Sequence, residues 1–80
     1  MHELHLIEPI IKSISEHAER EGAAAVTKIR LKIGELCGIK EESFREIFSL
    51  LARGTILENS QIELKFFPGT TIEVLPFDIE

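Results

Sequence analysis

The sequence predicts an α+β fold in which two helices pack on one face of a three-stranded mixed β-sheet. Two segments, 4–21 and 41–53, carry apolar residues at helical spacing. Three others, 27–34, 61–67 and 71–79, carry them at every second position, as strands with one buried face do. The order is therefore helix, strand, helix, strand, strand. A strand–helix–strand connection crosses over right-handed, so the first two strands are expected to be parallel.

The first helix is expected to bury one stripe, made of Ile7, Ile10, Ile11, Ile14 and Ala18. Pro9 lacks an N–H group and is tolerated in a first helical turn. Regular helix is therefore expected to begin near Pro9, after a looser turn. Gly22 follows the last turn and is a helix stop signal.

The remaining elements are expected to complete one core. The second helix should present Phe44, Ile47, Phe48 and Leu51 to it and end at Gly54. The inward sets of the strands are Thr27, Ile29, Leu31 and Ile33; then Ile62, Leu64 and Phe66; then Ile72, Val74, Phe77 and Ile79. The last set changes parity at Leu75-Pro76, which predicts a bulge there.

Composition limits the classes of protein to which the chain can belong. Eighty residues with 44% hydrophobic content are expected to form one domain, 1–80. No apolar run is long enough for a membrane span, and the net charge of −5 argues against nucleic acid as a partner. Acidic residues stand where a signal peptide needs positive charge, and Cys37 is the single cysteine. Both features favour a cytoplasmic protein.

The first three residues, Met1, His2 and Glu3, are the most distinctive chemical feature. A free amino group, main-chain nitrogens and a nearby imidazole can form a compact, nitrogen-rich chelate. That donor set suits square-planar Ni(II) or Cu(II). The motif is weak alone, because any protein can begin this way.

Beyond its first residues, the chain resembles the HypA family of hydrogenase nickel-incorporation proteins. The segments that carry the resemblance are 1–4, 26–39, 54–55, 62–64 and 68–69. The resemblance implies a small cytoplasmic metallochaperone, not an enzyme, which delivers Ni(II) to the large subunit of [NiFe]-hydrogenase with a HypB-like GTPase. It implies that His2 and main-chain nitrogens hold nickel, so the role maps onto Met1, His2 and Glu3. Glu3 would contribute its main-chain nitrogen, its carboxylate or only its charge.

One segment departs from the family pattern. The family normally carries a zinc module with two Cys-x-x-Cys pairs between its last two main strands. Here the turn at 68–71 stands in its place, and Cys37 belongs to a different turn. No structural zinc is therefore expected.

Three other side chains are weaker candidates as metal ligands. His5 is an auxiliary or labile ligand, or it only covers the first helix. His17 is expected to be exposed, and Cys37 is a soft ligand or a small packed residue.

Alternative functions and surfaces stay open. The chain could be a HypA-like protein-interaction module that no longer delivers metal, or an unrelated domain that begins with Met-His-Glu by chance. No nucleophile–base pair stands out, which argues against an enzyme. The charged outer face of the sheet predicts solvated cross-strand pairs, or else a docking face or a sheet edge for homodimerisation: Lys28, Arg30, Lys32, Glu63, Lys65 and Glu73.

Overall fold

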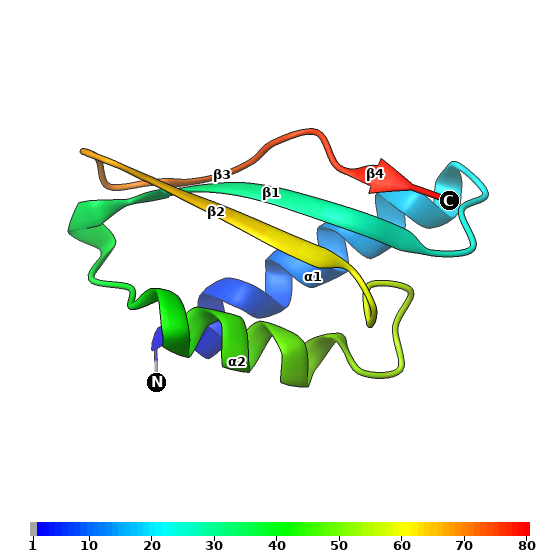
Figure 1. Cartoon of the computed structure of the whole chain (residues 1–80), viewed down its shortest axis with the longest axis horizontal. Coiled ribbons are helices and arrows are strands. Elements are labelled where there is room, and N and C mark those ends of the chain that lie inside the picture. Colours follow the sequence, from blue (N-terminus) through cyan, green and yellow to red (C-terminus); the bar gives the residue numbers. More distant parts are fainter. Residues whose placement is uncertain (1) are drawn as a thin grey trace.

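A computed structural model describes residues 2–80 of the chain, except for the side chain of His2 (Figure 1). Two long helices, α1 (His2–Arg20) and α2 (Glu41–Ala52), lie on the same face of one sheet. The strands are β1 (Val26–Gly34), β2 (Gln61–Phe67), β3 (Ile72–Val74) and β4 (Asp78–Ile79). A 3-10 turn, η1 (Glu35–Cys37), follows β1. The predicted α+β class and the two-layer arrangement are confirmed.

Strand β1 is the centre of the sheet. It pairs with β2 in parallel, with Ile29 opposite Ile62 and Leu31 opposite Leu64. On its other side it pairs antiparallel with β3 and with β4. The mixed sheet and the parallel pairing of the first two strands are as the sequence predicted.

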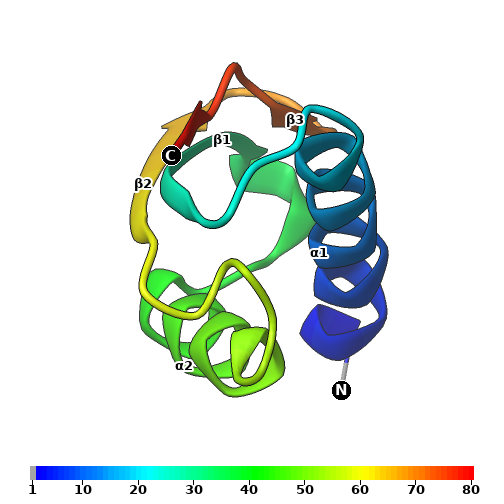
Figure 2. The same cartoon turned by 90° about the vertical axis from the view of Figure 1, so that its right-hand side faces the viewer.

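The core lies between the sheet and the two helices (Figure 2). The rings of Phe44 and Phe48 stack with centroids 6.1 Å apart. Both helices contribute the stripes expected of them, while Ala52 and Leu57 are additions that the spacing did not predict. The buried apolar residues are Ile7, Ile11, Ile14, Ala18, Val26, Ile29, Leu31, Ile33, Phe44, Phe48, Ala52 and Leu57.

The start of α1 differs from the prediction, because the helix runs without a break from His2 and contains Pro9. Pro9 lies on the exposed side, where water can reach the helix carbonyl that loses its N–H partner. The opposite side is continuous, because half-buried Leu4 and buried Ile7 extend the apolar stripe through the first two turns. Burial of that stripe outweighs the local cost of proline.

The end of α1 is as expected and has a defined hydrogen-bond pattern. Gly22 has a φ of 76°, which glycine adopts without steric cost. The Gly22 N–H donates to the Glu19 carbonyl and the Ala23 N–H donates to the Ala18 carbonyl. These two bonds form a Schellman motif, which satisfies carbonyls of the last turn.

Strand β1 begins with an irregularity that the alternation did not reveal. Val26 is buried and Thr27 is only half-buried, the reverse of the expected inward set. The pairing of β1 with β4 shifts register between Val26 and Lys28, which turns Val26 into the core. The Thr27 hydroxyl instead donates to the Asp78 carbonyl over 3.3 Å.

The last predicted strand is divided into β3 and β4, so the sheet has four strands and not three. The break falls at 75–77, where the sequence predicted a bulge, because Pro76 cannot donate to the β1 ladder. Val74 and Ile79 were expected to point inward, but they lie on this irregular edge and are 43% and 41% exposed.

The turn at 68–71 packs tightly against the end of β1. The Leu36 N–H donates to the Gly69 carbonyl, and the Gly34 N–H donates to the Thr71 carbonyl. A Cβ at Gly34 would lie 2.4 Å from the Gly69 oxygen, so only glycine fits there. The β2–β3 connection is thus closed directly onto β1.

Within the described part of the chain, no helix combines the length and the apolarity that crossing a lipid bilayer requires.

Candidate metal centre

The predicted nickel ligands fall at the amino-terminal end of α1. Met1 lies outside the described residues, and His2 is the first residue of the helix, with its side chain outside the description. Glu3 occupies the first turn and is half-buried. The structure therefore places the backbones of two predicted ligands in one helical turn, at the end of the element labelled N in Figure 1.

The main-chain nitrogens of this turn are chemically suited to ligation. The first four N–H groups of an α-helix have no acceptor within the helix. His2 and Glu3 are the first two residues of α1, so their amide nitrogens belong to this set. Deprotonation of either nitrogen in favour of a metal would break no helical hydrogen bond.

The charges at this end of α1 have opposing effects on the binding of a cation. The positive end of the helix dipole opposes a bound cation. Each amide nitrogen that loses its proton brings a negative charge, and Glu3 is the acidic residue of the first turn. A main-chain chelate would therefore offset the dipole, whereas a lone imidazole would not.

The other histidines and the cysteine have different surroundings. His5 is exposed and stands three residues after His2 on the helical backbone, a spacing that brings two residues to neighbouring turns. His17 lies about 22 Å from His2 along the axis of α1, at a rise of about 1.5 Å per residue. Cys37 is a half-buried free thiol in η1. Among the residues that the structure describes, no three His, Cys, Asp or Glu side chains gather where they could hold a metal ion.

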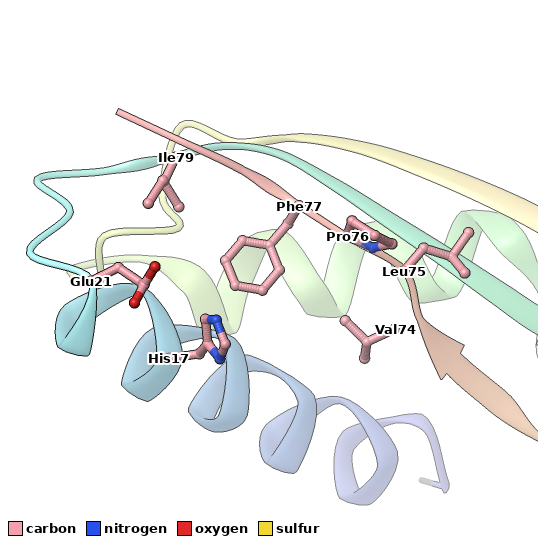
Figure 3. A pocket seen from close by; sticks show the side chains of 7 residues that line it. All are labelled: His17, Glu21, Val74, Leu75, Pro76, Phe77 and Ile79. Carbon is pink, nitrogen blue, oxygen red and sulfur yellow. The ribbon is translucent and has the colours of Figure 1, made fainter.

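His17 belongs to a shallow hollow that the sequence did not predict (Figure 3). The hollow has a volume of about 400 Å³ and lies between α1 and the irregular 74–79 edge. The His17 ring meets the Phe77 ring edge-on, with centroids 5.5 Å apart and an interplanar angle of 80°. Aromatic packing accounts for His17, which is exposed as expected.

The outer face of the sheet carries the cross-strand pairs that the sequence predicted. Lys28 Nζ lies 2.8 Å from Glu63 Oε2, and Arg30 Nε lies 3.7 Å from Glu63 Oε1. The hydrogen bond from Lys28 lowers the pKa of the Glu63 carboxyl below its ordinary value. Lys32 Nζ lies 5.0 Å from the centre of the Phe67 ring, a cation–π contact that alternation alone did not reveal.

Asp78 is a partner on this face that the sequence reasoning missed. Two guanidinium nitrogens of Arg30 each donate to an Asp78 carboxylate oxygen over 3.2 Å. This bidentate contact lowers the pKa of Asp78 and raises the pKa of Arg30. It exists because β4 returns to pair with β1 after the break at Pro76.

Comparison with known proteins shows which family this chain resembles in sequence. The family model described as "Hydrogenase/urease nickel incorporation, metallochaperone, hypA" matches residues 1–72. The hydrogenase maturation factor HypA of Beijerinckia indica is 36% identical over 69 residues, which cover 86% of this chain and 61% of that protein. The corresponding factor of Archaeoglobus fulgidus is 38% identical over 64 residues, which cover 80% of this chain and 58% of that protein. The chain thus spans about three fifths of the length of these relatives.

A solved structure shows the same fold. The solution structure of the Ni metallochaperone HypA from Helicobacter pylori superposes with a TM-score of 0.80 at 12% identity, over 96% of each chain. The structural likeness and the family-model match over most of the chain agree. This chain belongs to the HypA family.

Proposed function

We propose that this chain is a nickel-binding metallochaperone of the HypA type, which holds Ni(II) at its amino terminus and has no catalytic activity of its own. The observation that carries the proposal is that the family match begins at residue 1 and so includes Met1, His2 and Glu3. The proposed recipient is the large subunit of [NiFe]-hydrogenase, and the proposed helper is a HypB-like GTPase.

The chemistry of the proposed site follows from its donors. The Met1 amine, the His2 imidazole and the amide nitrogens of His2 and Glu3 form a set that favours square-planar Ni(II). Cu(II) binds such donors more tightly, so selection of nickel falls to the supply of metal and to partner proteins. Exposed His5, in the next turn, is available as an auxiliary ligand during transfer.

Nickel titration of the untagged chain tests this proposal. We expect His2→Ala to abolish binding, while the helical circular dichroism and the melting temperature stay nearly unchanged. The reason is that residue 2 precedes Leu4 and Ile7, where the apolar stripe of α1 begins. His17→Ala is the matched control, since it removes a histidine from the same helix far from the proposed site. Equal nickel affinity of wild type and His2→Ala would refute the proposal.

A blocked amino terminus separates a main-chain chelate from a side-chain site. Acetylation removes the donor capacity of the amine, and an N-terminal extension moves the amine away from His2. We expect either block to weaken nickel binding strongly, whereas a histidine-free C-terminal extension should not. A site made of the His2 and His5 side chains would tolerate the block and would be lost in His5→Ala. If the unblocked wild type does not bind nickel at all, the interaction-module alternative replaces this proposal.

We further propose that the chain holds no structural zinc. The resemblance implies a zinc module between the last two main strands of family members. In this chain the connection is the 68–71 turn, whose Thr71 carbonyl accepts a hydrogen bond from the end of β1 and whose Gly69 carbonyl accepts one from η1. The turn contains no cysteine or histidine that could ligate zinc.

A further inference from the structure

The two edges of the sheet differ in their capacity to pair with another strand. The edge formed by β3 and β4 consists of two short strands, and Pro76 interrupts it. Short strands and proline are features that discourage edge-to-edge pairing. Strand β2 has seven residues without glycine or proline, pairs only with β1, and forms the left-hand margin of the molecule in Figure 2.

The main chain of β2 offers hydrogen-bonding groups at its free edge. Arg45 Nη1 donates to the Ile62 carbonyl over 2.8 Å, which indicates that this carbonyl is accessible from outside the β1 ladder. Because peptide groups alternate along a strand, those of Leu64 and Phe66 are expected to face the same way. Among the described residues, no side chain or turn is bonded to the main chain of Leu64 or Phe66 outside the ladder with β1.

We propose that β2 is a homodimerisation edge, at which a second copy of this chain pairs antiparallel about a two-fold axis at Leu64. In this register Leu64 faces Leu64 of the second copy, Ile62 faces Phe66, and Glu63 faces Lys65. The two sheets then continue as one sheet across the axis. The helix layers of the two copies lie on the same face of this continuous sheet.

Charge complementarity selects this register. With the axis at Leu64, both outer-face pairs join Glu63 to Lys65, and these pairs have the closer side-chain spacing of an antiparallel ladder. Moving the axis by one residue would place Glu63 against Glu63, or Lys65 against Lys65. Such like-charge pairs are unfavourable, so the sequence of β2 disfavours both alternatives.

The single chain leaves Lys65 without a partner that dimerisation would supply. In the parallel ladder Lys65 lies opposite Lys32, a residue of like charge. No carboxylate of the described residues lies within ion-pair distance of Lys65. Glu63 is exposed and already contacts Lys28 and Arg30 within its own copy. In the dimer, Glu63 of the second copy would in addition approach Lys65 from the open side.

Apolar burial favours the same contact. Phe66 is 36% exposed although its side chain belongs to the helix-facing side of β2. Ile62 of the second copy would cover Phe66. Arg45 would release the Ile62 carbonyl and keep its 3.0 Å contact with Glu41. The alternative is that Arg45 and Lys65 only prevent the β2 edge of a monomer from pairing with another strand.

Sedimentation equilibrium over a wide concentration range tests the proposal on the whole chain. We expect a reversible dimer whose dissociation constant rises about tenfold or more in Lys65→Glu, because two favourable pairs become two like-charge pairs. Within one copy the same change replaces the Lys32–Lys65 pair by an opposite-charge pair, so the fold should be preserved. Lys12→Glu, on the exposed side of α1, is the control with the same charge change and should leave the dimer unaltered. A chain that stays monomeric, or a dimer indifferent to Lys65→Glu, would overturn the proposal.

Cross-linking tests the register. In a Cys37→Ser background, Leu64→Cys should form an intermolecular disulfide on mild oxidation, because Cα atoms facing each other in such a ladder are about 5.5 Å apart. Ile62→Cys should not, because the two copies of residue 62 stand four positions out of register. Circular dichroism would confirm that both variants fold. Cross-linking at residue 62 without cross-linking at residue 64 would contradict the proposed axis.

Discussion

Phe44 and Phe48 stand one turn apart on α2, and each is at most 1% exposed. The sequence identified both as core residues, because a spacing of four on an amphipathic helix selects one face. Their stacked contact adds aromatic packing to simple burial. They are among the largest fully buried side chains of the described residues.

Phe48→Ala should reduce the free energy of unfolding by about 3–5 kcal/mol, the usual cost of emptying a buried aromatic site. Chemical denaturation followed by circular dichroism measures this. Leu50→Ala on the same helix is the control, because Leu50 is 60% exposed and its loss should cost at most about 0.5 kcal/mol. A loss below about 1 kcal/mol for Phe48→Ala would show that this face of α2 is not packed as described.

The contact of Arg30 with Asp78 predicts a pH dependence of stability. The pKa of Asp78 is lowered in the fold by hydrogen bonds from Arg30, so folding favours the ionised carboxylate. The stabilising contribution is present above the ordinary carboxyl pKa of about 3.9. It is lost as the pH falls through the lower pKa of the folded chain.

Denaturation of wild type and Asp78→Asn from pH 6 to pH 2.5 measures this contribution. We expect the difference in unfolding free energy between them to shrink as the pH falls. Glu46→Gln is a control, because it removes an exposed carboxylate of α2 that forms no ion pair with the described residues. A constant difference between wild type and Asp78→Asn over this range would argue against the ion pair.

Single residues also show where sequence reasoning about the site reaches its limit. The chemistry of a nitrogen-rich chelate can be inferred from Met1, His2 and Glu3, but Met1 and the His2 side chain lie outside the described residues. The main-chain chelate therefore stays a prediction. The helical start at His2 adds one supporting fact, because it leaves the first amide nitrogens free of helical bonds.

The elements were predicted well where periodicity is strong and less well where local chemistry competes with packing. The bounds of α2 and β2 agree with the alternation and spacing within one residue. At Pro9 a local rule indicated a later start for α1, but burial of Leu4 and Ile7 extends the helix. The shift near Val26 and the division of the last strand depend on pairing between β1 and β4, which no local pattern encodes.

Pro9→Ala should make α1 more stable, because alanine restores the N–H donor in mid-helix and removes the clash of the proline ring. We expect the free energy of unfolding to rise by about 1–3 kcal/mol, reduced somewhat by the greater freedom of the unfolded chain. Thermal and chemical denaturation measure the gain. Pro68→Ala, in the exposed 68–71 turn, is the proline control and should bring no such gain. A destabilised Pro9→Ala variant would mean that α1 needs the proline at this point.

At the scale of the whole molecule, the chain should fold and stay folded without zinc. Twelve buried apolar residues from both helices, β1 and the 53–60 loop form one core that involves no metal ligand. We expect metal analysis of the purified chain to find no stoichiometric zinc, and a chelator to leave the melting temperature unchanged. As a control, nickel binding is measured after the chelator has been removed, which checks that the proposed amino-terminal site can still bind metal. One tightly held zinc per chain, with unfolding on chelation, would contradict this expectation.

The central position of β1 has a consequence for how the molecule opens. Strands β2, β3 and β4 all pair with β1, so removing β1 breaks every inter-strand bond of the described sheet. Its amide protons should therefore exchange with solvent only through global unfolding. Those of the two-residue β4 should exchange through local fraying. The chain between β1 and β2 contains α2, so these two strands are distant in sequence. During folding, the β1 amides that bond to β2 therefore become protected only after α2 has brought the two strands together.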